Sequence, residues 1–587
     1  MSELTAAGPA QRAIEACDYD AVVVNPHDGT EIAITVLQPA LACGQAAPLI
    51  IHGHGFGGAR LNARNERSIY EQLSGGLLPS TEAARRAADA GYFVISFDQR
   101  GFGESAGNVN IMDPQREGAD ISAILDWAER DMAHAEHLAY RDDGPVVGAL
   151  GLSYGGGFQL MGACVDPRFA AIVPTATWHD LSYSLAPDNV VKTAWGAALV
   201  ALGMPTSGID LDPVLYRALI EGLASPLTGR GLSSRVADEL YNHSPASYFD
   251  GQLARDGTRH AAPDQRRPPR VDALLIQGVG DTLFNLNEAV ANANGLRATG
   301  NDVHLIAVRH GHSLPFLQNI DRIAYQTEAD LHWGDQRVET AAIELAYLDW
   351  KLKGETPVSE IPHCAVIVDD RTGMVFEDMP RGSDAGGLTC ELEGEAVTGG
   401  LDLLLGLFRQ DTLGGLRDLV AGTVDNATTV LKRLWDSRGA DTRADDTGVL
   451  AKLVNALPTE HIDELTSGGV FIPLTRIEDD HRAVVGLPRA RIEVTGDAPS
   501  PVAFVGLGIE RPSRNATLLV NDQLRPVRGL GERDIELNGV AERLQAGDRL
   551  GLLVYGYHPQ YLASFSAIPG RVTVRGCIDI PLLDVGF

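Results

Sequence analysis

The sequence is poor in cysteine and in positive charge, and both shortages narrow its possible functions. Its 587 residues include only six cysteines, which are scattered without CxxC pairs or short spacings. Neither a zinc site nor a disulfide framework is therefore predicted. Lysine and arginine number 48 against 78 acidic residues, a formal net charge of −30. Because such a charge repels phosphate groups, we predict no nucleic-acid partner.

Long hydrophobic runs are missing as well. No apolar stretch approaches the roughly 18 residues of a membrane span. Residues 1–5 carry neither the basic nor the apolar segment typical of a signal peptide. We therefore predict a cytoplasmic protein without a membrane span. A content of 44% hydrophobic and 21% charged residues is typical of a globular protein, and the chain is too long for a single core.

A glycine-rich segment follows the apolar residues 145–147. Residues 151–155 read Gly-Leu-Ser-Tyr-Gly, which fits the pattern Gly-x-Ser-x-Gly, and a helix-like stretch follows at 158–164. In a nucleophile elbow the serine lies on a tight strand-to-helix turn, and small neighbours leave space for its backbone. We therefore consider Ser153 a candidate nucleophile. The alternative is an ordinary glycine-rich turn with a buried, hydrogen-bonded serine.

Two later strand ends supply a candidate acid and base. The apolar run 273–278 leads to Asp281, and the run at 303–308 leads to His312. The order Ser, Asp, His is that of the α/β-hydrolases, with room for one helix between the last two strands. His312 would accept the serine proton, while Asp281 would fix the imidazole tautomer. His310 is a rival base, but the glycine before His312 suits a loop that brings its histidine to the elbow.

A second glycine-rich loop follows the buried-strand pattern at 48–51. It reads His-Gly-His-Gly-Phe-Gly-Gly over residues 52–58 and leaves backbone N–H groups available at the strand end. We predict an oxyanion hole formed by the amides of Phe56 and Tyr154, although a shift of two residues would make the loop donor His54. The histidines also suggest a metal. Because no third ligand is evident nearby, we predict neither a metal nor another cofactor.

Asp98 is a further candidate for a catalytic acid, because it directly follows the strand-like run 92–97. A glycine-rich turn comes next, and Arg100 is two residues away. These neighbours favour a structural ion pair and turn over a catalytic role.

Periodicity changes along the chain and divides it into segments. Strand and helix patterns alternate first, then a helix-like stretch interrupts them, and short strands dominate the C-terminal part. We predict an α/β-hydrolase core at 1–177 and 251–360, a helical cap at 178–250, a C-terminal jelly-roll β-sandwich at 361–400 and 468–587, and a helical insertion at 401–467. The apolar face of the insertion would pack inside the protomer, or alternatively form a homo-oligomer contact or a second lid.

Four segments of the sequence have a familiar pattern: residues 151–156, with tyrosine after serine, 98–105, 348–354 and 546–550. With them the whole arrangement resembles the cocaine esterase and X-prolyl dipeptidyl aminopeptidase group, also called CocE/NonD or peptidase S15-like. That resemblance implies an α/β-hydrolase domain with a cap, a C-terminal jelly roll and a Ser-His-Asp triad. In that group a tyrosine hydroxyl commonly completes the oxyanion hole, whereas the loop here offers only backbone.

The expected function is hydrolysis of a small-molecule ester or amide through an acyl-enzyme. An aminopeptidase of the prolyl type is a second possibility, and it needs acidic cap residues for the substrate ammonium, for which Asp188, Asp210 and Asp212 are candidates. Acyl transfer on the same triad would also fit these residues. A non-catalytic binding role on a hydrolase fold is the hypothesis from a different class.

Overall fold

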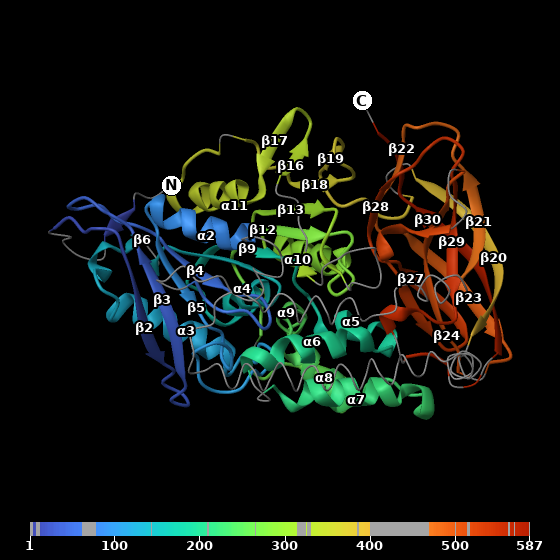
Figure 1. Ribbon diagram of the computed structural model, residues 1–587, viewed down its shortest axis with the longest axis horizontal. Coiled ribbons are helices and arrows are strands. Elements are labelled where there is room, and N and C mark those ends of the chain that lie inside the picture. Colours follow the sequence, from blue (N-terminus) through green and yellow to red (C-terminus); the bar gives the residue numbers. More distant parts are fainter. Residues whose placement is uncertain are drawn as a thin grey trace, which may run out of the picture.

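A computed structural model describes most of the chain (Figure 1). The helices predicted for residues 401–467 lie outside the described part. The described residues are 4–6, 12–61, 78–141, 144–207, 211–264, 266–313, 324–325, 330–357, 359–383, 387–398, 469–498, 500–512, 517–561, 564–566, 568 and 570–585.

A ten-stranded mixed sheet forms the centre of the molecule. Its order is β19-β18-β13-β12-β9-β8-β4-β5-β3-β2. The hairpin β2/β3 is antiparallel, whereas all neighbours from β5 to β18 are parallel. This order confirms the predicted α/β-hydrolase fold. The strand bounds are Cys17–Val24 (β2), Glu31–Gln38 (β3), Leu49–Gly53 (β4), Phe93–Phe97 (β5), Val147–Leu152 (β8), Phe169–Thr175 (β9), Asp272–Gly278 (β12) and Val303–Val308 (β13).

Helices cover both faces of this sheet. Helices α2 (Pro79–Asp89) and α11 (Thr340–Leu348) pack on one face and contact each other (Figure 1). Helices α3 (Glu117–Arg130), α4 (Tyr154–Val165) and α10 (Leu286–Ala298) pack on the other. Because both faces are covered, central strands such as β4 and β5 are entirely buried, which explains their continuous apolar sequences. No helix among the described residues is long and apolar enough to cross a membrane.

The large sheet extends further along the chain than predicted. Strand β18 (Cys364–Ile367) pairs in parallel with β13, and β19 (Gly373–Phe376) adds an antiparallel edge. Assignment of residues from 361 onward to the sandwich is therefore wrong. All four residues of β18 are buried, and such an unbroken apolar run is typical of a strand covered on both faces. The first sandwich strand is β20 (Leu388–Thr398).

The segment between β9 and β12, where a cap is predicted, is mainly helical. Asp180 accepts hydrogen bonds from the first amides of α5, and Asp212 does so for α7. These helices lie along one edge of the sheet, at the bottom of Figure 1. Their bounds are Leu181–Leu185 (α5), Thr193–Ser207 (α6), Pro213–Thr228 (α7), Ser234–Asn242 (α8) and Pro245–Phe249 (α9).

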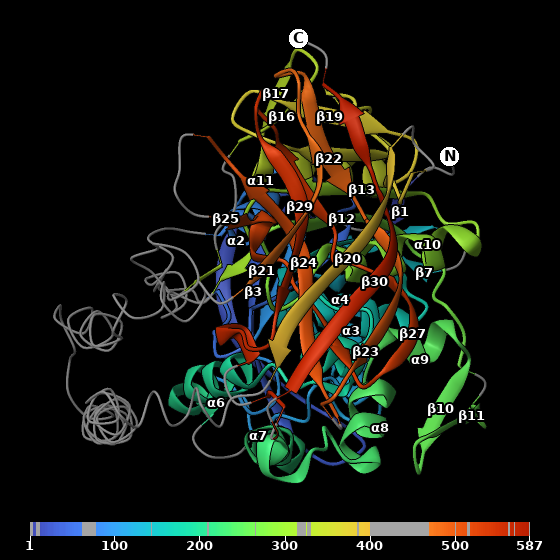
Figure 2. The ribbon, with the colours of Figure 1, turned by 90° about the vertical axis from the view of Figure 1, so that its right-hand side faces the viewer.

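The C-terminal part is a β-sandwich beside the large sheet, at the right of Figure 1. One antiparallel sheet has the order β20-β30-β23-β27 and is seen obliquely in Figure 2. The other has the order β21-β29-β24-β25, with β26 also on β24. A shared apolar core joins them; the jelly-roll connectivity stays a prediction. The principal bounds are Val470–Arg476 (β21), Arg489–Gly496 (β23), Val502–Glu510 (β24), Thr517–Leu519 (β25), Arg525–Arg528 (β26), Gly531–Glu536 (β27), Arg549–Tyr555 (β29) and Gly570–Ile580 (β30).

Candidate active site

Ser153 lies at the turn between β8 and α4. Its backbone has φ 61° and ψ −115°, a conformation that is unfavourable for a residue with a Cβ atom. The neighbouring glycines are required by close approach, because a Cβ built on Gly155 would lie 2.1 Å from the carbonyl oxygen of Gly53. The Ser153 amide donates to the carbonyl of Thr175 at 2.8 Å. The segment therefore has the strand, strained residue and helix of a nucleophile elbow.

Asp281 and His312 form a buried pair. The distance from His312 Nδ1 to Asp281 Oδ2 is 2.6 Å, and neither side chain is more than 4% exposed. The other carboxylate oxygen, Oδ1, accepts the amides of Leu283 and Phe284 at 3.0 and 2.7 Å. With Nδ1 donating to the carboxylate, Nε2 is the ring nitrogen able to accept a proton. Of the two candidate bases, it is therefore His312 rather than His310 that contacts Asp281.

The sheet topology brings these residues to one edge. Ser153 follows β8, Asp281 follows β12 and His312 follows β13, with only β9 between the first two strands. The carboxyl ends of neighbouring parallel strands meet at the same edge, where α/β proteins place their ligand sites. The order of the three residues along the chain thus corresponds to a shared place in the fold.

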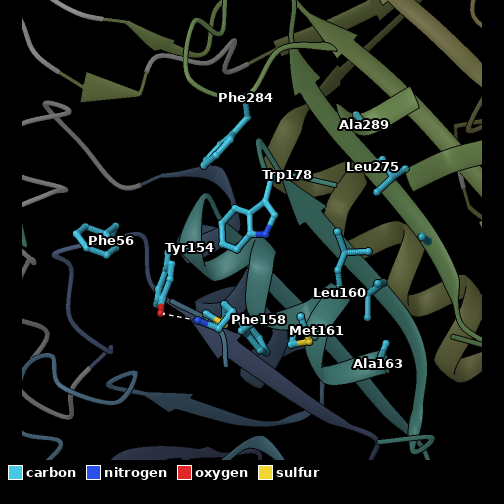
Figure 3. Packing of buried hydrophobic residues seen from close by; sticks show 14 of the residues in the cluster. Phe56, Tyr154, Phe158, Leu160, Met161, Ala163, Trp178, Leu275, Phe284 and Ala289 are labelled. Carbon is cyan, nitrogen blue, oxygen red and sulfur yellow. Dashed lines mark hydrogen bonds between the residues drawn. The ribbon is translucent and has the colours of Figure 1, made fainter. Parts of the chain in front are cut away.

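An aromatic wall is formed by Tyr154, Trp178 and Phe284 (Figure 3), and it leads from the elbow to His312. The ring centroids of Tyr154 and Trp178 are 6.1 Å apart, and those of Trp178 and Phe284 are 5.3 Å apart. Phe284 then meets the imidazole of His312 edge to face at 5.5 Å. Trp195 packs on the same imidazole at 6.2 Å. The two rings place apolar surface against His312, which strengthens its electrostatic interaction with Asp281.

The side chains of the two residues predicted to supply oxyanion donors lie beside each other. The Tyr154 hydroxyl accepts the amide of Met112 at 3.2 Å (Figure 3), so it is the Tyr154 amide, at the N-terminus of α4, that can face a substrate oxygen. The ring of Phe56 packs edge to face on that of Tyr154 at 5.4 Å. The backbone of His54 is also close, because a Cβ built on Gly155 would lie 3.1 Å from its carbonyl oxygen.

Both histidines of the loop after β4 have partners within the protein. His54 Nδ1 donates to the carbonyl of Gly55 at 2.7 Å, and its Nε2 accepts the amide of Gln99 at 3.0 Å. His52 Nδ1 lies 2.9 Å from Ser96 Oγ, and burial lowers the pKa of His52 to about 3. Within the described ranges no group of three or more His, Cys, Asp and Glu side chains is arranged to hold a metal. These contacts make both rings neutral parts of the core.

Asp98 lies in a buried ion pair, but its partner differs from the predicted one. Its carboxylate is hydrogen-bonded to the guanidinium of Arg60 and accepts the amides of Arg60 and Glu104 at 2.6 and 2.9 Å. The prediction of Arg100 as partner is wrong. Arg100 binds Asp120 and Asp28 instead, at 2.7 and 2.6 Å. Although Arg100 is closer to Asp98 in sequence, its guanidinium pairs with other carboxylates.

Sequence reasoning missed the residues that hold the backbone around the candidate acid. We call residues 281–284 the acid turn. All four of its carbonyl oxygens accept side-chain hydrogen bonds, and no sequence motif indicates the donors. They are Gln523 Nε2 to Asp281 (3.1 Å), Lys192 Nζ to Thr282 and Leu283 (2.9 Å each) and Gln277 Nε2 to Phe284 (2.7 Å).

Comparison with known proteins agrees with this fold. Residues 28–313 match the model of the X-Pro dipeptidyl-peptidase (S15) family. An uncharacterised 31.7 kDa protein from the traX-finO intergenic region of Escherichia coli is 34% identical over 133 residues, which cover 23% of this chain and 38% of that protein. Cutinase 2 of Thermobifida cellulosilytica is 27% identical over 36% of this chain and 68% of its own length.

A CocE/NonD family hydrolase from Staphylococcus aureus has a similar solved structure. The TM-score is 0.55 at 12% identity, and the match covers 97% of both chains. The likeness therefore extends over the α/β core, the cap and the sandwich. Together the matches support an enzyme of the hydrolase class. They also confirm the resemblance to the S15 and CocE/NonD group that the sequence indicates.

Proposed function

We propose that this protein is a serine hydrolase that cleaves a carboxylic ester, or an amide, through an acyl-enzyme on Ser153. The observation that carries the proposal is the 2.6 Å contact between His312 and Asp281, buried at the sheet edge that also bears the strained Ser153. A neutral histidine held by a buried carboxylate is the arrangement that activates a serine hydroxyl. The sequence match to a peptidase family over the same residues adds support.

In the proposed mechanism Ser153 Oγ attacks the substrate carbonyl carbon while His312 Nε2 takes its proton. Asp281 stabilises the imidazolium that forms, and its own position is fixed by two backbone amides. The negative oxygen of the tetrahedral intermediate would be bound by the Tyr154 amide and by one loop amide, that of Phe56 or of His54. His312 then protonates the leaving alcohol or amine. Water, activated by the same imidazole, releases the acid.

An X-prolyl aminopeptidase is the second candidate, and the family match favours it. Such an enzyme needs an acidic pocket for the substrate ammonium. Two of the three cap aspartates have other partners, because Asp188 accepts the amide of Arg528 at 2.6 Å and Asp212 accepts the amide of Val214 at 2.8 Å. Asp210 lies outside the described residues. Since these carboxylates serve contacts within the chain, we favour the esterase.

Labelling and turnover test this assignment together. We expect a fluorophosphonate probe to label the wild type on Ser153, and a series of p-nitrophenyl esters from acetate to palmitate to be hydrolysed. Ser153→Ala should lose both. Ser233→Ala, an exposed cap position whose hydroxyl contacts Glu221, is the matched control and should retain both. Hydrolysis of a Gly-Pro anilide at a higher kcat/KM than any ester would replace the esterase by the aminopeptidase.

Two further outcomes would contradict the proposal. Ester hydrolysis retained by Ser153→Ala would mean that another nucleophile does the chemistry. A wild type that binds an ester but neither hydrolyses it nor reacts with the probe would favour a non-catalytic role. If an added alcohol accelerates release of p-nitrophenol and appears as a new ester, the deacylating nucleophile is not restricted to water, and acyl transfer becomes the function.

The remaining sequence predictions accompany this proposal. No disulfide joins the six cysteines, all of which lie in the described part of the chain, which suits the predicted reducing cytoplasm. Homo-oligomer formation stays a prediction.

A further inference from the structure

The acid turn receives hydrogen bonds from three different parts of the molecule. Gln277 belongs to β12 of the α/β core, Lys192 belongs to the cap, and Gln523 lies just before β26 of the sandwich. The α/β core therefore supplies one of these four contacts to the turn carbonyls, and the cap and the sandwich supply three. The acid turn itself contains the Asp281 carboxylate and the two backbone amides, of Leu283 and Phe284, that donate to it.

Lys192 reaches the turn from the residue before α6. It is 2% exposed, and an ammonium buried to this extent loses most of its hydration. Its Nζ donates to the carbonyls of Thr282 and Leu283 at 2.9 Å each. The charged groups near it are Asp281, Glu288 and Arg525, and burial lowers its pKa to about 8. The Lys192 ammonium thus contacts the backbone that directly follows the candidate acid.

The same turn is bonded to the backbone of His312. The amide of Thr282 donates to the His312 carbonyl at 3.0 Å, and the Thr282 hydroxyl donates to the same carbonyl at 3.2 Å. Trp195, three residues after Lys192, donates its ring N–H to that hydroxyl at 3.1 Å. Movement of the cap segment would therefore be transmitted to the acid and the base together.

Gln523 holds the turn from the sandwich side. It is 3% exposed, and its Nε2 donates to the carbonyl of Asp281 at 3.1 Å. The orientation of its amide is fixed because Oε1 accepts from Asn538 Nδ2 at 3.0 Å. Asn538 also donates to the carbonyl of Leu524. This buried side-chain pair thus leads from the sandwich to the backbone of the candidate acid.

We propose that Lys192 and Gln523 are positioning residues, through which the cap and the sandwich hold Asp281 in the orientation that binds His312. The inference rests on the proposed function and adds to it, because it makes the site dependent on all three parts of the chain. Two carbonyl contacts from Lys192 and one from Gln523 fix the turn, and the fixed turn aims its carboxylate.

Replacement of each residue, with matched controls, tests the inference. Lys192→Met and Gln523→Leu keep the side-chain volume and remove the hydrogen bonds. The controls are Lys351→Met, a mostly buried lysine paired with Asp272 and Asp302, and Gln38→Leu, a buried glutamine that donates to the carbonyl of Glu15. The wild type and all four variants are measured with p-nitrophenyl butyrate over pH 5–9, and folding is checked by circular dichroism.

We expect kcat to fall by about 10²-fold in Lys192→Met, the size of effect that a small misplacement of a reacting group produces. We expect KM to change little, because neither residue faces the substrate. The kcat of Gln523→Leu should fall less, by about 10-fold. The controls should match the wild type.

A folded Lys192→Met protein with the kcat of the wild type would overturn the inference. If Lys192→Met does not fold, Gln523→Leu decides, because it removes one neutral hydrogen bond and no charge. Wild-type kcat in the folded Gln523→Leu protein would then refute the role of the sandwich. Failure of the proposed function is distinguishable, because in that case the wild type itself is not labelled on Ser153.

Discussion

Asp98 and Asp281 occupy similar places in the fold and differ in what they bind. Each lies beyond the carboxyl end of a parallel strand, β5 and β12 respectively, and each is almost fully buried. Each also accepts two backbone amides. Asp98, however, binds the permanent cation of Arg60, whereas Asp281 binds the imidazole of His312.

The partner therefore decides what a buried carboxylate can do. A guanidinium stays protonated at any pH at which proteins are folded, so the pair with Arg60 can only hold the loop after β4 to the turn after β5. An imidazole gains and loses a proton near neutral pH, so the pair with His312 can take part in a reaction cycle. Replacement of Asp281 by Asn should therefore lower activity, whereas replacement of Asp98 by Asn should lower stability.

The largest effect is expected from Asp281→Asn. The amide keeps the shape of the acid turn but favours the wrong imidazole tautomer, so kcat for a p-nitrophenyl ester should fall by about 10⁴-fold. Thermal unfolding should change little. Steady-state kinetics beside a melting curve check both statements. A variant with near wild-type kcat would remove Asp281 from the proposed triad.

Asp98→Asn should show the opposite pattern. It removes the buried counter-ion of the Arg60 guanidinium and leaves only the more exposed Glu104 and Asp20, at 2.6 and 3.7 Å. The free energy of unfolding should therefore fall by about 3 kcal/mol. The kcat of the protein that remains folded should stay close to the wild type. Urea denaturation, followed by active-site titration with the serine probe, separates the two quantities.

The double variant Arg60→Met with Asp98→Leu is the control for this loss. Because it removes both charges together, it should recover most of the stability that the single change loses. If the double variant were less stable than Asp98→Asn, the loss of stability would come from the lost ion pair itself and not from an unpaired buried charge.

A third buried carboxyl, Glu344 of α11, sharpens the comparison because no cation in the described part of the chain pairs with it. It contacts the hydroxyl of Thr175 at 3.4 Å, and burial raises its pKa to about 8. The folded protein thus keeps a proton that the unfolded chain releases above pH 4.5. Stability contributed by this proton is present below pH 4.5 and is lost as the pH rises to about 8.

Glu344→Met should therefore flatten the pH dependence of stability. We expect the variant to gain about 2 kcal/mol over the wild type at pH 8 and to gain much less at pH 5. Chemical denaturation at the two pH values measures the difference. An equal gain at both would attribute the effect to packing and not to the proton.

Much of the candidate site could be predicted from the sequence, because the ends of buried strands are recognisable. Apolar runs at 147–152, 272–278 and 303–308 end beside Ser153 and beside the turns that carry Asp281 and His312, and parallel strands place such ends on one edge. The role of the elbow glycines could be predicted for a similar reason. They are local requirements of one tight turn.

Most of the contacts that escaped prediction join segments distant in sequence. Arg60 reaches Asp98 over 38 residues, although Arg100 is nearer along the chain. Lys192 and Gln523 reach the acid turn only because the cap and the sandwich dock there. Residues 364–367 could have been assigned to the large sheet, because their unbroken apolar run is typical of a strand covered on both faces.

The contact of Gln523 with Asp281 spans 242 residues of chain, and this has a consequence in time. At a synthesis rate of roughly 5–20 residues per second, Gln523 is added some tens of seconds after Asp281. A ribosome-bound chain stalled before β25 should therefore react with the serine probe more slowly than the full chain. On this view the unfinished chain already carries Ser153, Asp281 and His312 but reaches its full reactivity only when its last part has folded.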